Sequence, residues 1–214
     1  MNILTNYEEL KKLTGYSFQN ERVSKRIIGI LFARPNPFTK DEILSGIDYF
    51  NNRSGKIINF FCAGYQPSEY NEKLDVVAKV DNENWSFDSK IFNKIRQETE
   101  QFSKWKYSGS VELVLFNAIK NNEQVELDFS DAICIDLMKS KNQNLITSTG
   151  ELFEEIFRLS ENLDESNPSK NLSLKLIGDT AKNSFIPILI KLLPKQIQKH
   201  SQKIYMFGTE NRKN

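Results

Sequence analysis

Cysteine and histidine, on which soft-metal and thiol chemistry depend, are nearly absent from this 214-residue sequence. Its only cysteines, Cys62 and Cys134, lie inside apolar runs and form no CxxC pair, so we predict buried, reduced and inert thiols. A structural zinc site needs four closely spaced ligands, so we expect no metal. The only histidine, His200, lies in a basic C-terminal stretch, and no GxSxG motif occurs. Serine–histidine hydrolase chemistry is therefore disfavoured.

The sequence also lacks a signal-peptide pattern, a long apolar run and a large net charge. No run approaches the ~20 apolar residues of a membrane span, so we expect a cytoplasmic protein with no membrane partner. Because 29 Lys and Arg balance 28 Asp and Glu, the net charge of +1 gives no field that would attract nucleic acid. The basic stretch from Lys191 to Lys213 is interpreted as a solvated helix face followed by a tail. Neither a GxGxxG nor a P-loop motif occurs, and we predict no cofactor.

Two apolar strands joined by a helix open the predicted fold, after a helical segment within residues 1–25. Residues 26–33 (RIIGILFA) and 56–63 (KIINFFCA) are apolar enough to be buried on both faces of a sheet. Between them, Thr39 and Glu42 have the spacing of a capping box, which predicts a helix beginning there. A strand–helix–strand unit of this kind is expected to be parallel and right-handed.

Strands and helices continue to alternate in the remainder of the sequence. We predict an edge strand at 74–80, a helix from the cap Asp88 to Ser103, an antiparallel hairpin of 109–118 with 125–138, a helix capped by Ser148 and Glu151, a strand at 172–176, a helix capped by Ser184, and a short strand at 203–207. This alternation predicts one α/β domain over residues 1–214, with a frayed tail at 208–214. The expected architecture is a three-layer sandwich around a mixed, mostly parallel sheet.

The order of the first seven predicted elements, β-α-β-α-β-β-α, is similar to that of thioredoxin. This resemblance implies an alternative architecture, a thioredoxin-like core with a C-terminal extension. The redox pair of cysteines is missing, and no proline precedes the strand at 109–118, where that fold has its cis-proline. Such a module would be catalytically inactive.

Candidate ligand-binding residues follow from the rule that open α/β sheets bind ligands beyond the carboxyl ends of their parallel strands. These candidates are Arg34 and Asn36 after the first strand, Tyr65 after the second, and Asp179, Thr180 and Lys182 after the late strand. Asn117 joins them only if its strand is parallel to the first two.

Two of these turns have residues suited to an anion. In the segment Ile177 to Ser184, a glycine is followed by hydroxyl and ammonium donors at a predicted helix N-terminus, although an ordinary strand-to-helix turn is the alternative. Arg34 can hold a phosphate or carboxylate with two parallel hydrogen bonds. Its alternative role is an ion pair with an acidic neighbour.

Acid–base candidates are carboxylates that interrupt apolar patterns. Glu98 lies on an apolar helix face, and Asp131 and Asp136 lie in an apolar strand. Burial would raise the pKa of each side chain, but each can equally accept hydrogen bonds from backbone amides. The sequence does not identify catalytic residues.

Three functions are compatible with these observations. The favoured one is a non-catalytic binding or regulatory module that acts through a protein partner or as a homo-oligomer. The alternative is a small enzyme or sensor handling a nucleotide or another phosphorylated small molecule. A nucleic-acid-associated protein that uses the basic C-terminus is the third. Whether the protein is an enzyme stays open.

Overall fold

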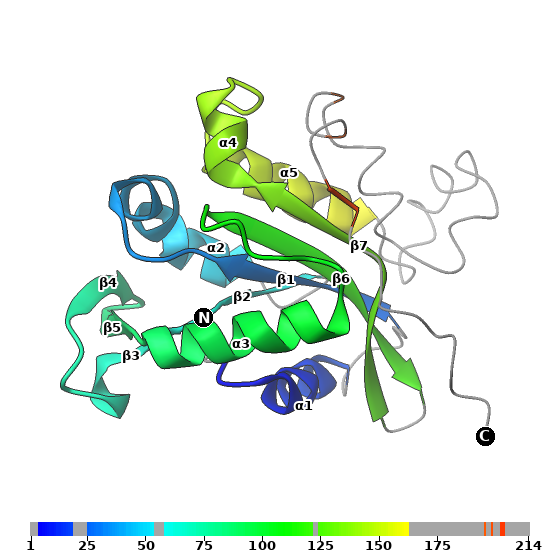
Figure 1. The fold of residues 1–214 in the computed structure, drawn as a ribbon, viewed down its shortest axis with the longest axis horizontal. Helices are drawn as coiled ribbons and strands as arrows, with labels where there is room; N and C mark the ends of the chain where they lie inside the picture. Colours follow the sequence, from blue (N-terminus) through cyan, green and yellow to red (C-terminus); the bar gives the residue numbers. More distant parts are fainter. Residues whose placement is uncertain are drawn as a thin grey trace.

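The computed structural model describes residues 4–18, 25–53, 58–121, 124–162, 195, 198 and 202–203. It has a mixed α/β fold with one sheet of five strands and a second sheet of three (Figure 1). The helices of the described residues are α1 (Tyr7–Ser17), α2 (Ile47–Arg53), α3 (Ser89–Phe102), α4 (Leu137–Asn142) and α5 (Thr149–Asn162). The predicted strand at 172–176 and the helix capped by Ser184 lie outside the described residues.

The larger sheet is mixed, and its strands follow the order β2-β1-β6-β7-β8. Its members are β1 (Lys25–Phe32), β2 (Ile58–Cys62), β6 (Glu112–Asn121), β7 (Gln124–Asp136) and β8 (Gln202–Lys203). The expected parallel pairing of the first two strands is confirmed, with Ile27 opposite Ile58. The expected antiparallel hairpin is confirmed as β6 and β7.

The expectation that the sheet is mostly parallel is wrong. Of the described pairings, only that of β1 with β2 is parallel; β6 runs antiparallel to β1, as do β7 to β6 and β8 to β7. The reason is the connection from α3, residues 103–111, which runs back along that helix and starts β6 at the edge where β1 ends, so that Glu112 pairs with Phe32. Once β6 enters from that edge it must run against β1, and the hairpin then fixes the direction of β7.

The smaller sheet comprises β3 (Tyr65–Pro67), β5 (Glu83–Phe87) and β4 (Val76–Val80), in that order. The strand predicted at 74–80 is present as β4, but it pairs in this second sheet, which the sequence analysis did not predict. Asp81 and Asn82 join β4 to β5 with φ angles of 50° and 68°. These left-handed conformations are typical of a two-residue hairpin turn, and Asp and Asn tolerate them well.

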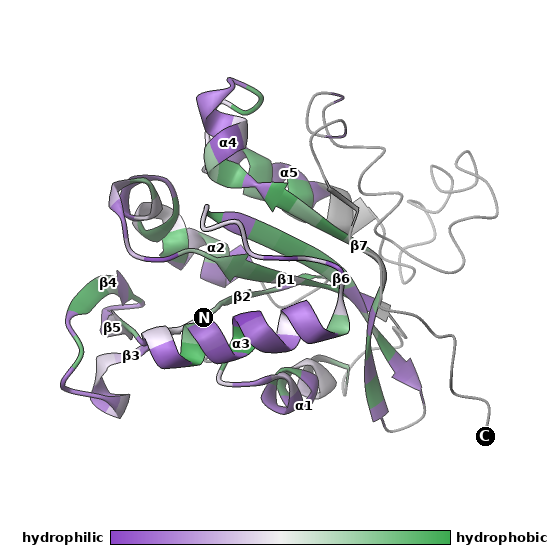
Figure 2. Ribbon diagram, in the orientation of Figure 1, coloured by the Kyte–Doolittle hydropathy of each residue, from purple (hydrophilic) through white to green (hydrophobic). Residues whose placement is uncertain are grey.

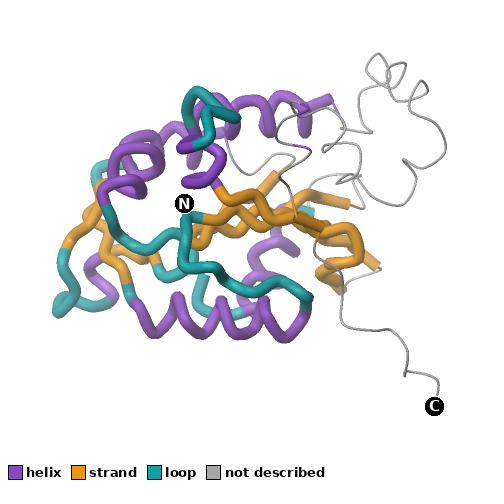
Figure 3. The backbone as a smooth tube through the Cα atoms, turned by 45° about the horizontal axis from the view of Figure 1, so that its top comes forward, coloured by secondary structure: helices purple, strands orange, loops and turns teal. Residues whose placement is uncertain are grey.

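Helices cover both faces of the larger sheet (Figures 1 and 3). On one face, α2 and α5 pack against residues such as Ile27 and Leu31. On the other face, α1 and α3 pack against residues such as Ile28 and Ile30. These neighbours alternate between faces because side chains of a strand point to opposite sides. The outer surface of α3 is mainly hydrophilic, as Figure 2 shows.

Of the three predicted helix caps that fall on described residues, two are present. The Asp88 side chain accepts hydrogen bonds from the first turn of α3, and Ser148 Oγ accepts one from the backbone of Glu151 at 3.1 Å. The capping box of Thr39 and Glu42 is wrong. Asn36 Oδ1 instead accepts from Thr39 N at 2.8 Å, and Pro37 is the first helical residue.

Beyond that first turn the helix is irregular. It passes through a π-helical segment, Thr39–Ile43, and a 3₁₀ segment, Leu44–Gly46, before α2 begins.

Candidate functional site

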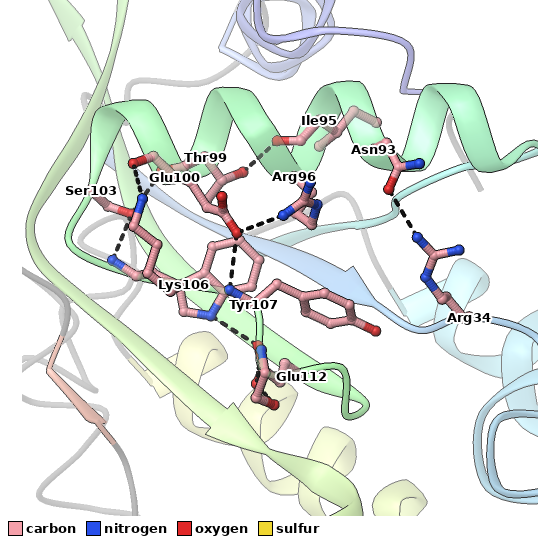
Figure 4. Close-up of polar contacts among 12 residues, drawn as sticks. Arg34, Asn93, Ile95, Arg96, Thr99, Glu100, Ser103, Lys106, Tyr107 and Glu112 are labelled. Carbon is pink, nitrogen blue, oxygen red and sulfur yellow. Dashed lines mark hydrogen bonds and ion pairs between the residues drawn. The ribbon is translucent and has the colours of Figure 1, made fainter.

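Arg34 lies at the carboxyl edge of β1, where the sequence places it, and its side chain is exposed. Its Nη2 donates to Asn93 Oδ1 at 2.9 Å, and its guanidinium carbon lies 4.5 Å from the centre of the Phe92 ring (Figure 4). Both partners belong to α3, whose N-terminus is fixed by the Asp88 cap. The guanidinium is therefore held on one face by an aromatic ring and at one edge by an amide.

The Phe92 ring under Arg34 belongs to an aromatic cluster. Its side chain is fully buried, and its centre lies 5.6 Å from that of Phe87, 6.0 Å from that of Phe32 and 5.4 Å from that of Tyr107. Such a packed ring cannot move away from the cation above it. A cation–π contact of this kind contributes about 0.5–2 kcal/mol.

Tyr107 reaches the same position from the segment that joins α3 to β6, here called the α3–β6 loop (residues 103–111). Its hydroxyl points toward Arg34 in Figure 4 and has no hydrogen-bond partner among the described residues. Burial, the largest effect, raises the pKa of Tyr107, whereas the nearby Arg34 and Arg96 act to lower it. The phenol is therefore neutral at physiological pH and can donate a hydrogen bond.

Arg96 is the second cation near Tyr107, but a carboxylate neutralises it. Its Nη1 lies 3.0 Å from Glu100 Oε1, an oxygen that also accepts from Tyr107 N at 3.1 Å. Arg34, by contrast, forms no ion pair with any described residue. The two arginines thus differ in the charge left available to a ligand.

Glu112, the first residue of β6, is a buried carboxylate beneath this loop, with 4% of its surface exposed. Oε2 accepts from Trp105 Nε1 at 2.9 Å, and Oε1 accepts from the backbone and hydroxyl of Ser108. Burial raises the pKa of Glu112 despite these hydrogen bonds, and the neighbouring Asp136 adds to the increase.

The other predicted ligand-binding residues have structural roles or lie outside the described part. The Asn36 side chain caps a helix, and the buried Tyr65 donates its hydroxyl to Ala33 O at 2.9 Å. Asn117 does not join this edge, because β6 is antiparallel to β1 and Asn117 pairs with Ile27 within the sheet. Asp179, Thr180 and Lys182 lie outside the described residues.

The predicted acid–base candidates also hold the structure together. Glu98 Oε2 accepts from Tyr7 N at the start of α1, at 3.0 Å. Asp136 caps α4 through Lys139 N at 2.8 Å. The side chain of Asp131 is not among those described.

The sequence analysis missed Glu112 and Asn93. A usable signal existed only for Glu112, which is an acidic residue inside the apolar strand VELVLFNA.

Both cysteines are free and buried, and burial raises the pKa of Cys62 to about 12. Within the described ranges, no group of three metal-ligating side chains comes together. Over the same ranges, no helix is both long and apolar enough to cross a membrane. Comparisons of the chain with protein-family models, with curated proteins and with solved structures found no match.

Proposed function

We propose that the protein is a non-catalytic binding module that recognises an anionic group of its partner through Arg34. The observation that carries this proposal is that Arg34 is exposed, oriented by two α3 residues and not neutralised by any described carboxylate. Stacking and a single hydrogen bond leave most of its N–H groups available. A planar guanidinium of this kind matches the oxygens of a carboxylate or phosphate with two parallel hydrogen bonds.

Preorganisation supports a binding role for this arginine. A free arginine side chain loses about 2 kcal/mol of rotamer entropy when a ligand fixes it. Here Phe92 and Asn93 already restrict the side chain before a ligand arrives. Less of the interaction energy is then spent on ordering the arginine, so affinity rises.

The groups around Arg34 support binding more than catalysis. Glu100 is paired with Arg96, and Glu112 accepts hydrogen bonds from the α3–β6 loop, so both carboxylates are engaged. The raised pKa of Tyr107 keeps its phenol protonated, so it can donate a hydrogen bond, and the phenolate that a general base would need is not populated.

We further propose that the larger sheet is the core of a three-layer sandwich of the thioredoxin-like type. The support is the parallel pair β1 and β2 beside the antiparallel strands β6 and β7, with helices on both faces. The arginine would then lie at the edge of the sheet where the first strand ends. A sensor of a phosphorylated small molecule is the alternative function, because the same guanidinium chemistry would serve it.

The test is a binding titration by calorimetry or NMR, with inorganic phosphate, a panel of phosphorylated small molecules, and acidic peptides. Arg34→Ala is expected to weaken binding by about 1.5–3 kcal/mol, roughly ten- to a hundredfold, because a charged hydrogen-bond donor is lost. Lys12→Ala, which removes an exposed charge from α1, is the control for net charge and should bind as the wild type does.

The outcome also separates the two functions. Preference for peptides indicates a protein partner, and preference for small phosphates indicates the sensor. Equal binding by wild type and a folded Arg34→Ala variant would contradict both.

A further inference from the structure

The α3–β6 loop has no helix or strand, yet many side-chain hydrogen bonds hold it. Glu100 accepts from the backbone of Tyr107, and Ser110 Oγ donates to Asp136 Oδ1 at 2.8 Å. Glu112 accepts from both Trp105 and Ser108. Acceptors outside the loop therefore determine its conformation.

Glu112 makes contacts that require both of its oxygens to be acceptors. Oε2 faces Trp105 Nε1, and Oε1 faces Ser108 N at 3.3 Å. An indole N–H and a backbone N–H can only donate. Oε1 also accepts from the Ser108 hydroxyl. The charged carboxylate accepts all three hydrogen bonds at once, whereas the NH₂ group of an amide would face either Trp105 Nε1 or Ser108 N.

The burial of this charge has no electrostatic compensation among the described residues. No described cation forms an ion pair with Glu112, and its cross-strand neighbour is the acidic Asp136. Burying a carboxylate without a cation is unfavourable even when neutral donors surround it. A buried carboxylate that has no cation beside it and a raised pKa is a candidate for a functional role.

Tyr107 connects Glu112 to the candidate site. It lies between the two donors of the loop in sequence, and its ring packs edge-on against Phe92, the ring that supports Arg34. Arg34 and Glu112 act on the pKa of Tyr107 in opposite directions, which places the phenol within electrostatic reach of both.

We infer that Glu112 is a positioning residue for the Arg34 site, whose charged carboxylate fixes the α3–β6 loop and so holds Tyr107 beside Arg34. Its effect on affinity rests on the proposed anion-binding function, but its effect on the loop does not. The ionisable side chains that act on Glu112 or respond to its charge are Asp136 and Cys134 from β7 and Tyr107 from the loop.

Acid should change the hydrogen bonds of Glu112 without exposing it. A pKa raised by burial means that the buried side chain binds a proton more readily than an exposed one, so protonation does not by itself favour opening of the loop. When the pH falls through the pKa of Glu112, the carboxyl becomes neutral and its hydrogen bonds to Trp105 and Ser108 weaken. This titration is expected above the pH range of an ordinary glutamate, and removing the charge of Asp136 should move it to lower pH.

The experiment follows the Trp105 indole N–H resonance and the hydrogen exchange of the loop amides against pH, without ligand. The Trp105 signal, identified by its loss in Trp105→Phe, should shift with one acid titration in the wild type. In Glu112→Gln that titration should disappear, and the loop amides should exchange roughly tenfold faster at neutral pH, the equivalent of one hydrogen bond.

Asp136→Asn is the matched control. It keeps both the α4 cap and the hydrogen bond to the loop, because an asparagine Oδ1 also accepts from Lys139 N and Ser110 Oγ. Its loop should stay ordered, and its Trp105 titration should shift to lower pH. If Glu112→Gln does not fold, Trp105→Phe and Ser108→Ala remove the two donors separately and should each speed exchange in the loop.

Inorganic phosphate then tests the link to binding. Glu112→Gln should weaken phosphate binding several-fold, and Asp136→Asn should not. Unchanged loop exchange in Glu112→Gln overturns the inference, as does a loosened loop with unchanged phosphate affinity. If the wild type binds neither phosphate nor any other anion tested, the proposed function fails, whereas the exchange data still decide whether Glu112 positions Tyr107.

Discussion

Gly29, in the middle of β1, has no space for a side chain, so we predict that even alanine at this position destabilises the protein. A Cβ atom at this position would lie 2.5 Å from Cδ1 and Cε1 of Phe60 and 3.2 Å from Cδ2 of Leu115. Ordinary contacts between carbon atoms begin near 3.5 Å, so the Phe60 ring would have to move by about 1 Å.

Two aromatic rings beside Phe60 oppose that movement. It packs edge-on against Phe153 and Phe157 of α5, with ring centres 5.0 Å and 5.3 Å away. Overpacking a core in this way costs about 1–3 kcal/mol. Replacing glycine by alanine also stabilises the folded state by about 0.4–1 kcal/mol, because alanine lowers the conformational entropy of the unfolded chain. Gly29→Ala is therefore expected to lower the free energy of unfolding by about 1–2 kcal/mol.

Urea denaturation measures this loss as a lower midpoint with an unchanged m-value. Phe60→Leu provides the matched background, because it removes the ring that the new methyl group meets. In that background the loss from Gly29→Ala should fall below about 0.5 kcal/mol, so the two substitutions should not be additive. The reasoning is refuted if Gly29→Ala is neutral, or if it destabilises both backgrounds equally.

Two further predictions concern titratable groups. Burial opposes the charge of Glu42, but hydrogen bonds from Thr149 and Lys141 outweigh it and lower the pKa of Glu42. Glu42→Gln should therefore lower the free energy of unfolding by about 1 kcal/mol at neutral pH. In urea denaturation repeated at decreasing pH, the difference between wild type and variant should disappear as the pH falls through the lowered pKa of Glu42. A difference that persists in acid would contradict the stabilising role of the charged carboxylate. Cys62 and Cys134 should react with a thiol reagent only when the protein unfolds, because burial raises the pKa of both, and rapid labelling of native protein would overturn this.

The elements that could be predicted are those whose signal is local. The apolar runs of β1 and β2 and the helix between them were enough to predict a parallel pair, since a right-handed crossover is nearly obligatory. The link between β6 and β7 was short enough to predict a hairpin. The direction of β6 relative to β1 depends on the path of the loop that follows α3, which no local pattern encodes.

The cap after β1 shows how two local signals can compete. Asn36 and Thr39 are both favoured N-cap residues, but only Thr39 has a glutamate three residues later, so the capping-box pattern favours Thr39. Pro37 distinguishes them, because proline favours the first position of a helix and therefore places the cap at the residue before it. Glu42 instead binds the N-terminus of α5 through Thr149 N at 3.2 Å, a contact between residues 107 positions apart.

Long-range partners also decide which acidic residue belongs to the candidate site. In the sequence, Glu98, Asp136 and Glu112 look alike, because each interrupts or borders an apolar segment. In the structure, Glu98 and Asp136 each cap a helix, so the helix N-terminus itself explains their position. Glu112 faces no helix end; its donors come from an irregular loop whose conformation it maintains. The role of each carboxylate therefore follows from what its hydrogen-bond donors would do without it. Without Glu98 or Asp136, a helix N-terminus would fray. Without Glu112, the loop beside Arg34 would lose the conformation that places Tyr107 there.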